Sequence, residues 1–316
     1  MAKTPLDIVV ITQDVPGLAE GIARACPQVR VHAGQNTADA LGKAENASVL
    51  IGLAQTITPA LVAATPHLAW IQALTTGVDP LLALGLPAKI IVTSARGVHG
   101  PQMSEMAFLH MLALARGLPR MIGNQQRQSW ARWPQRLLLG KTVVLVGIGA
   151  ISEEVARRCK IFGMRVIGIS DARTAGDDFD DISPRSDLVA AAAEADFLIA
   201  LAAYTPQTRH LINAEVMDAL RPHAFLINLA RGPVVDEAAL IAHLTARRFA
   251  GAGLDVFDVE PLPGDSPLWR LDNVLITPHL GGMSDNYGDQ LLPLVVHNLR
   301  AFAAGQFDQM RNRIFL

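Results

Sequence analysis

Cysteine is scarce in this sequence. Cys26 and Cys159 are the only two cysteines among 316 residues, and neither stands in a metal-ligand spacing. A disulfide framework and a cysteine metal site are therefore not expected, which is typical of proteins from a reducing compartment. We accordingly predict no bound metal and a cytoplasmic location.

An excess of charge of one sign is also missing, because 27 lysines and arginines oppose 29 aspartates and glutamates. This balance leaves no basic footprint for nucleic acid or an anionic membrane. The first residues, Met1–Asp7, contain no apolar core of a signal peptide, and the longest apolar stretch, Asp187–Ala203, is interrupted by Glu194 and Asp196. We therefore predict no signal peptide, no transmembrane helix and no nucleic-acid or membrane partner.

Hydrophobic residues, by contrast, make up 50% of the chain, in short runs that alternate with longer Ala- and Leu-rich segments. This alternation is typical of βαβ units and parallel sheets, and the length predicts two domains. In a first, doubly wound series we expect strands at Asp7–Thr12, Val29–His32, Ser48–Gly52, Ala69–Ala73 and Ile90–Thr93. In a second series, from Lys141 onward, we expect strands at Thr142–Val146, Arg165–Ile169, Phe197–Ala202, Ala224–Asn228, Gly253–Phe257 and Val274–Thr277.

Three further segments connect or complete the two series. Gly100–Leu114 is rich in Met, Ala and Leu and predicts a helix. Gly117–Gly140 is polar, contains Trp130 and Trp133, and predicts a connecting arm. Asp285–Ala304 is amphipathic with helical spacing, and it can pack back on the first domain because it follows the last strand of the second series.

A strand, a glycine turn and a helix follow one another over residues 143–162, in the order that a dinucleotide site requires. Gly147 permits the tight turn, and Gly149 lets the backbone approach a pyrophosphate at the helix N-terminus, where free N–H groups favour anions. Ser152 replaces the usual third glycine, yet a small residue still allows the helix to pack on the strand. The loop therefore predicts nucleotide binding, although an ordinary βα turn is the alternative.

The residue after the second strand of this series should contact the adenosine ribose. An acid there binds the 2′-hydroxyl and repels a 2′-phosphate. Here the place falls on Ser170, followed by Asp171 and Arg173. Serine removes the repulsion and Arg173 can pair with a 2′-phosphate, which favours NADP. Asp171 turned inward would favour NAD instead, and Arg173 can equally be a solvated loop cation.

Arg231, Glu260 and His279 each follow a predicted strand of the second series. Ligands of open α/β sheets bind beyond the carboxyl ends of the strands, so these three side chains are expected to converge. A guanidinium grips the carboxylate of a 2-keto acid at two points, and a histidine supplies the proton when a hydride reduces the ketone. A carboxylate on the other imidazole nitrogen orients it and favours its protonated form.

Each of these three residues also has an ordinary structural interpretation. Arg231 can end a helix or form a surface ion pair, Glu260 can be a loop acid before a proline, and His279 can be a turn residue. Their occurrence together, after a glycine-rich loop, favours the catalytic interpretation.

Taken in order, these motifs resemble the D-isomer-specific 2-hydroxyacid dehydrogenase family, including its glyoxylate/hydroxypyruvate reductases and phosphoglycerate dehydrogenases. The resemblance covers most of the chain and is densest from Gly140 to Gly282. Besides the glycine loop, the segments that carry it are Thr205–Arg209, Ile227–Asp236, Gly253–Phe257, Glu260-Pro261, Ser266–Trp269 and Pro278–Gly282.

The resemblance implies an NAD- or NADP-dependent oxidoreductase that acts on small 2-keto or D-2-hydroxy acids. It implies two doubly wound α/β domains: a flavodoxin-like substrate domain, residues 1–99 completed by 283–316, and a Rossmann nucleotide-binding domain, residues 100–282. It places the active site between them. It also implies a homodimer, joined largely through the nucleotide domain and an arm over residues 100–140.

The resemblance assigns Arg231 as substrate clamp, His279 as acid and base, and Glu260 as its partner. The loop Thr75–Val78, with Thr76 and Gly77, resembles the backbone that holds the substrate carboxylate, with a plain βα turn as the alternative. Cofactor contacts are implied at Gly147, Gly149, Ala150, Ile151, Ser170, Arg173, Ala203, Leu229, Ala230, Asp255, His279, Gly281 and Gly282.

Some positions depart from the family pattern. Ala202-Ala203 stands where many members have a proline, and Ser152 and Ser170 leave the choice between NADP and NAD open. Trp130 and Trp133 resemble arm tryptophans of glyoxylate/hydroxypyruvate reductases, in which the arm can reach the partner subunit's site, but burial at the dimer contact is the simpler interpretation.

Three rival functions follow from the same residues. A nucleotide-sensing binding protein would keep this fold without turnover, and the complete set of Arg231, Glu260 and His279 argues against it. Formate dehydrogenase activity is a second rival, but that related group carries glutamine where Glu260 stands, so the carboxylate argues against it. A purely structural α/β protein would leave the ordered motifs unexplained.

Overall fold

The computed structural model describes residues 5–315, which form two compact units. The first unit contains residues 5–99 and 283–315, and the second contains Gly100–Gly282. Met1–Thr4 and Leu316 lie outside the described residues, and with them most of the segment in which we predict no signal peptide. No helix in the described part is long and apolar enough to cross a membrane.

The first unit is built on a parallel sheet whose last strand alone runs antiparallel. Its strands are β1 (Leu6–Ile11), β2 (Val29–Gly34), β3 (Val49–Gly52), β4 (Trp70–Ala73), β5 (Ile91–Thr93) and β13 (Arg313–Ile314). Its helices are α1 (Leu18–Ala25), α2 (Thr37–Leu41), α3 (Pro59–Ala63), α4 (Asp79–Leu82) and α11 (Tyr287–Ala303), with short 3-10 turns at Ala54–Thr56 and Phe307–Gln309.

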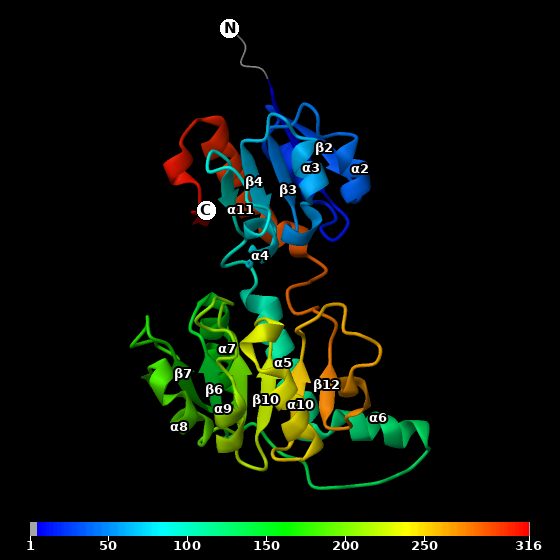
Figure 1. Ribbon diagram of the computed structural model, residues 1–316, viewed down its shortest axis with the longest axis vertical. Helices are drawn as coiled ribbons and strands as arrows, with labels where there is room; N and C mark the ends of the chain where they lie inside the picture. Colours follow the sequence, from blue (N-terminus) through cyan, green and yellow to red (C-terminus); the bar gives the residue numbers. More distant parts are fainter. Residues whose placement is uncertain (1–4, 316) are drawn as a thin grey trace. The chain divides into compact units, whose positions relative to one another are not determined.

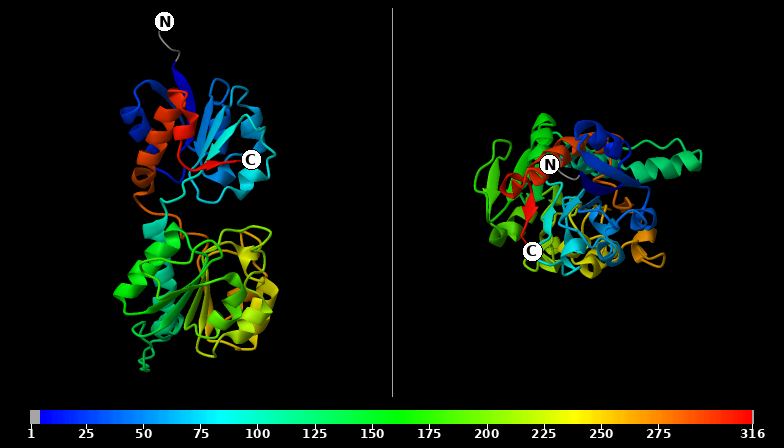
Figure 2. Two further views of the ribbon diagram at one scale, coloured as in Figure 1. Left: turned by 90° about the vertical axis from the view of Figure 1, so that its left-hand side faces the viewer. Right: turned by 90° about the horizontal axis from the view of Figure 1, so that it is seen from above.

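Helices cover both faces of this first sheet (Figure 2). Its order, β13-β5-β4-β3-β1-β2, reverses direction between β1 and β3, as in doubly wound flavodoxin-like folds. Successive residues of a strand point to opposite faces. Ile8 and Val10 accordingly enter a core with α1 and α11, whereas Val9 and Ile11 enter a core with the other helices of this unit.

The second unit contains a wholly parallel sheet. Its strands are β6 (Thr142–Val146), β7 (Arg165–Ile169), β8 (Asp181–Ser183), β9 (Phe197–Ala200), β10 (Phe225–Asn228), β11 (Gly251–Leu254) and β12 (Val274–Ile276). Its helices are α5 (Gly100–Arg116), α6 (Leu118–Gln126), α7 (Ala150–Ile161), α8 (Leu188–Ala192), α9 (Ala214–Ala219) and α10 (Glu237–Thr245), with 3-10 turns at Arg185–Asp187, Gly232–Val234 and Pro267–Arg270.

The second sheet also has both faces covered, as parallel sheets require (Figures 1 and 2). Val143 and Leu145 of β6 pack with α5 and α7, whereas Val144 and Val146 pack with α8, α9 and α10. The strand order β12-β11-β10-β9-β6-β7-β8 places its reversal between β6 and β9. The predicted fold class, two doubly wound α/β domains on parallel sheets, is confirmed.

The structure corrects several predicted elements. The strand expected at Gly253–Phe257 is β11 at Gly251–Leu254, two residues earlier. The hydrophobic pattern misplaces this strand because two of its four residues are glycines. Glycine is required at Gly251, where a Cβ would lie 2.3 Å from Asn273 O. The predicted arm begins with a helix, α6, while the short strands β8 and β13 were not predicted.

Candidate active site

The polar side chains predicted to act together follow three neighbouring strands of the second unit. Arg231 follows β10, Glu260 follows β11 and His279 follows β12. These strands are adjacent and parallel in the order β12-β11-β10, so their carboxyl ends lie at one edge of the sheet. The same edge carries the glycine loop after β6.

The structure joins His279 and Glu260 directly. His279 Nδ1 donates to Glu260 Oε2 at 2.7 Å, while the Phe257 N–H donates to the other carboxylate oxygen at 3.0 Å. Burial raises the pKa of the Glu260 carboxyl, but the bonds from His279 and Phe257 and the positive charges of His279 and Arg231 outweigh it, so the pKa lies below its ordinary value. Glu260 is therefore an anion that accepts from Nδ1 and leaves Nε2 to face a ligand.

The backbone that carries His279 is unusual for a non-glycine residue, with φ at 54° in the left-handed region. Asp255, which is buried, holds it in this conformation. The His279 N–H donates to the Asp255 backbone oxygen, and the N–H groups of Leu280 and Gly281 donate to the Asp255 carboxylate, each at 2.9 Å. Three successive amides are thus bound by one residue.

Arg231 lies in a turn that Asn228 braces from within. The Asn228 amide donates to Arg231 O at 3.1 Å, and its oxygen accepts from the Ala230 N–H at 3.1 Å. Arg231 Nη1 donates to Ala230 O at 2.7 Å. A Cβ at the next residue, Gly232, would lie 2.0 Å from the Phe257 carbonyl, so only glycine lets the Arg231 loop approach the segment that leads to Glu260.

The glycine loop meets the requirements of a pyrophosphate site. Gly147 has φ at 95°, and a Cβ there would lie 2.6 Å from Ala202 Cα, so the close passage of the β6 and β9 loops demands glycine. Gly149 precedes α7 and faces open space, where a diphosphate can reach the free N–H groups of the first helical turn. Ser152 is buried and donates to Gly147 O at 2.5 Å, so the third-glycine position braces the loop.

The ribose end of this site contains three predicted residues and one that was missed. Ser170 Oγ accepts from the Arg173 N–H at 3.1 Å and closes the turn after β7. Arg173 pairs with Glu153 at 2.6 Å, so it is an ion-paired cation and not one solvated by water alone. Asp171 accepts from the Arg185 backbone at 2.8 Å and from its guanidinium, which lower the pKa of the Asp171 carboxyl. Asp171 is therefore engaged by an arginine.

The remaining predicted cofactor positions occupy the same edge of the second sheet. Leu229 and Ala230 are buried residues of the turn between β10 and Arg231, and the Ala203 carbonyl accepts from the Thr208 hydroxyl at 2.7 Å. Ala150 and Ile151 begin α7, and the Gly282 carbonyl accepts from Gln102 at 3.4 Å.

Thr76 and Gly77 lie in the first unit, after β4. Thr76 Oγ1 is 2.8 Å from His99 Nδ1, and His99 Nε2 is 2.6 Å from the Tyr287 hydroxyl, which also donates to Leu74 O. Two buried side chains, His99 and Tyr287, thus fix the loop expected to hold the substrate carboxylate.

Sequence reasoning missed Asn228, Arg185 and a buried histidine, His110, that bonds to Thr277. Asn228 had a usable signal, because an asparagine at the end of a buried strand commonly caps the turn that follows. Among the described residues, no group of three His, Cys, Asp or Glu side chains is arranged to hold a metal ion.

Comparison with known proteins places this chain in a family. Residues 108–281 match the family model described as "D-isomer specific 2-hydroxyacid dehydrogenase, NAD binding domain". A D-3-phosphoglycerate dehydrogenase of Methanocaldococcus jannaschii is 30% identical over 312 residues, which is 94% of this chain and 58% of that protein. The chain therefore spans little more than half of that relative's length.

Two solved structures are similar over nearly the whole chain. A D-isomer specific 2-hydroxyacid dehydrogenase family protein of Aeromonas salmonicida has a TM-score of 0.91 at 32% identity, covering 98% of this chain and 99% of its own. An NADPH-dependent glyoxylate/hydroxypyruvate reductase of Sinorhizobium meliloti, solved with NADP and sulfate, has a TM-score of 0.84 at 25% identity and covers 98% of each chain. These findings support the predicted nicotinamide-linked oxidoreductase. The predicted resemblance is confirmed: the chain belongs to the D-isomer specific 2-hydroxyacid dehydrogenase family.

Proposed function

We propose that this protein reduces small 2-keto acids to 2-hydroxy acids with a nicotinamide dinucleotide, and catalyses the reverse oxidation. The observation that carries the proposal is the 2.7 Å pair of His279 and Glu260, at the sheet edge that also holds Arg231 and the glycine loop. A structural protein has no need of a left-handed histidine on a carboxylate at a ligand-binding edge.

In this proposal each residue has one role. Arg231 binds the substrate carboxylate through its planar fork and keeps the ketone in place. The bound nicotinamide supplies the hydride that adds to C2. His279 Nε2 gives its proton to the ketone oxygen, and Glu260 stabilises the imidazolium before that transfer. In the oxidation, the same nitrogen takes the hydroxyl proton.

The glycine loop fits the pyrophosphate of such a cofactor, and the ribose end favours NADP. Ser170 carries no charge, and Asp171 is held by Arg185, so a 2′-phosphate meets less repulsion than beside an unpaired acid. Arg173 adds a positive charge that can leave Glu153 for the phosphate. The related Sinorhizobium meliloti reductase is NADPH-dependent, which supports the same choice.

The test is a panel of 2-keto acids, with glyoxylate and hydroxypyruvate among them, assayed with NADPH and NADH in parallel. We expect turnover with at least one acid and a higher kcat/KM with NADPH. Binding of NADPH without turnover on a broad panel would instead support a nucleotide sensor. Equal or better use of NADH would overturn the cofactor preference alone.

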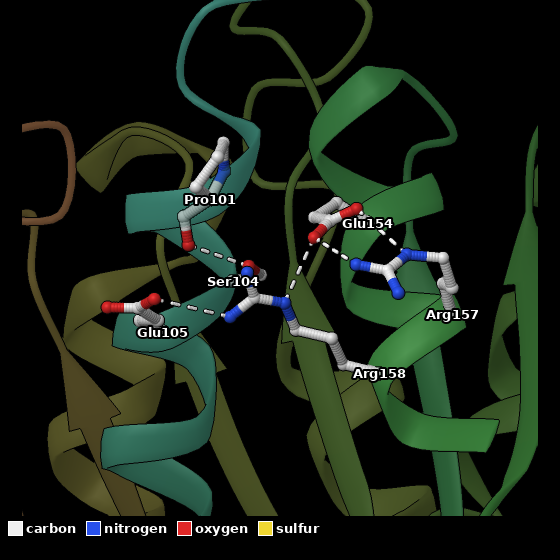
Figure 3. Close-up of polar contacts among 6 residues, drawn as sticks. All are labelled: Pro101, Ser104, Glu105, Glu154, Arg157 and Arg158. Atoms are coloured by element: carbon white, nitrogen blue, oxygen red, sulfur yellow. Dashed lines mark hydrogen bonds and ion pairs between the residues drawn. The ribbon is translucent and has the colours of Figure 1, made fainter. Parts of the chain in front are cut away.

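We also propose that two copies of the chain associate through the face where α5 packs on α7. Figure 3 shows the charged side chains where α5 and α7 of one chain meet. Arg158 pairs with Glu154 of its own helix at 3.0 Å and with Glu105 of α5 at 3.5 Å. Large apolar side chains are exposed on these helices and on the preceding arm: Leu109, Leu112, Leu137, Leu139, Ile161 and Phe162. Exposed large apolar side chains on two packed helices and the neighbouring arm support association through this face.

The dimer has a direct test by sedimentation or light scattering. Leu109→Arg should convert the dimer to a monomer, because it buries an unpaired charge in the contact. Leu41→Arg, on an exposed leucine of α2 in the first unit, is the matched control and should leave the dimer intact. A monomeric parent protein would overturn the dimer. Trp130 is 94% exposed, and its predicted burial at the dimer contact can be tested in the same way, by a substitution and a measurement of the oligomeric state. The cytoplasmic location stays a prediction.

A further inference from the structure

His110 is a buried histidine beneath the proposed active site. It projects from α5, its side chain has no exposed surface, and burial lowers its pKa to about 4 although the Asp255 charge opposes this. His110 is therefore neutral at ordinary pH. Its Nε2 lies 3.1 Å from Thr277 Oγ1, whereas its Nδ1 is buried without a partner among the described residues.

The direction of the hydrogen bonds follows from Asp255. Thr277 Oγ1 lies 2.6 Å from Asp255 Oδ1. A carboxylate only accepts, so the single hydroxyl proton of Thr277 points to Asp255. His110 must then carry its proton on Nε2 and donate to Thr277. The result is one chain of donors, from His110 through Thr277 to Asp255.

Asp255 is the residue that holds the loop of His279. It binds the N–H groups of His279, Leu280 and Gly281, each at 2.9 Å, and so stabilises the left-handed backbone at His279. Packing leaves little slack at this point, because a Cβ at Gly281 would lie 2.9 Å from Asp255 Oδ2. A displacement of the Asp255 carboxylate would therefore disturb the amides of Leu280 and Gly281, which follow His279 directly.

We propose that His110 is a positioning residue of the reaction, which acts through Thr277 and Asp255 to hold the His279 imidazole in place against Glu260. This role rests on the proposed function. It explains a cost in the structure, namely a buried ring nitrogen without a partner. It also explains Gly253, where a Cβ would lie 2.3 Å from His110 Nδ1, so β11 carries glycine to admit the ring.

The first test compares His110→Leu with His110→Gln in kcat and KM. Leucine removes the donor to Thr277, whereas the glutamine amide can replace it. We expect His110→Leu to lower kcat about 10-fold, as for one lost buried hydrogen bond, with the KM for the keto acid changed less than about 3-fold. His110→Gln should recover turnover to within about 3-fold of the parent. Parental turnover in His110→Leu would overturn the role.

A second pair of variants tests the same chain if His110→Leu does not fold. Thr277→Val removes the hydroxyl at nearly constant volume, and Thr277→Ser keeps it. We expect Thr277→Val to lower kcat and Thr277→Ser to preserve it. Equal turnover in both variants would refute the role of the chain of donors. Combining Thr277→Val with His110→Leu should cost no more than the larger single effect, because both interrupt one chain.

A purely structural role is separated by Met111→Ala. Met111 is equally buried on α5 but belongs to the apolar core. This variant should lower Tm and leave kcat near the parental value at temperatures well below Tm. A loss of kcat in Met111→Ala as large as in His110→Leu would overturn the relay. A parent protein inactive on the whole panel would overturn the proposed function, and this role with it, whereas an active parent with an equally active His110→Leu would overturn this role alone.

Discussion

Replacing Glu260 by glutamine removes the charge beside His279 and little else. The side chain keeps its shape and can still accept the Phe257 N–H, but the anion that favours imidazolium is lost. A hydrogen bond to a charged group contributes about 1.5–3 kcal/mol in a shielded place. Here the side chains of His279 and Glu260 are 46% and 34% exposed, so water screens the pair. The lower end, about 1.5 kcal/mol, corresponds to about a 10-fold loss.

We therefore expect Glu260→Gln to lower kcat for keto-acid reduction about 10-fold at neutral pH, with NADPH affinity nearly unchanged. The assay follows NADPH oxidation under saturating substrate, and cofactor binding is measured separately by fluorescence. Glu237→Gln is the matched control. Glu237 also accepts a backbone N–H, from Asp258 at 3.0 Å, but it does not bond to His279.

Two results would refute this reasoning. A Glu260→Gln protein with parental kcat would show that the carboxylate does not support proton transfer. An equal loss in Glu237→Gln would show that the effect comes from disturbed loops rather than from the charge on His279.

The remaining predictions concern the other two catalytic candidates and acid stability. His279→Gln should lower kcat about 100- to 10,000-fold and leave NADPH binding intact, and near-parental turnover would remove His279 from the mechanism. Arg231→Lys should lower kcat/KM for the keto acid about 100-fold, because an ammonium cannot form the two-point contact, and unchanged kinetics would contradict the clamp. The hydrogen bond from Lys160 and the Val166 N–H hold the pKa of Asp180 below its ordinary value. Its contribution to stability is therefore present above about pH 4 and is lost as the pH falls through the folded-state pKa, so Asp180→Asn should lower Tm at about pH 7 but not at about pH 2.

Much of the fold could be predicted because parallel strands are buried on both faces and leave continuous apolar runs. The runs at Thr142–Val146 and Arg165–Ile169 coincide with β6 and β7 to the residue. β13 could not be predicted this way, since its two residues form a strand only by pairing antiparallel with β5, far away in the sequence. β11 was displaced because its glycines carry no hydrophobic signal.

The candidate site divides along the same line. Arg231, Glu260 and His279 were predicted because each lies in the loop that follows a strand, where chain order alone brings a side chain to the ligand-binding edge. Arg185 was missed, because it lies 14 residues after Asp171, beyond the short strand β8 that was not predicted. Nothing in the local sequence predicts how such a segment folds back.

His110 shows the same limit more sharply. The local sequence places it in a predicted helix rich in Met, Ala and Leu, where a histidine is distinguished from its apolar neighbours only by its partner. That partner, Thr277, is 167 residues away. Asp255, to which Thr277 donates, lies 22 residues before Thr277 in the chain. The residues that perform chemistry follow from strand ends, whereas those that position them depend on contacts across the whole unit. The second group is therefore where structure adds most, and where the variants of His110 and Thr277 are most informative.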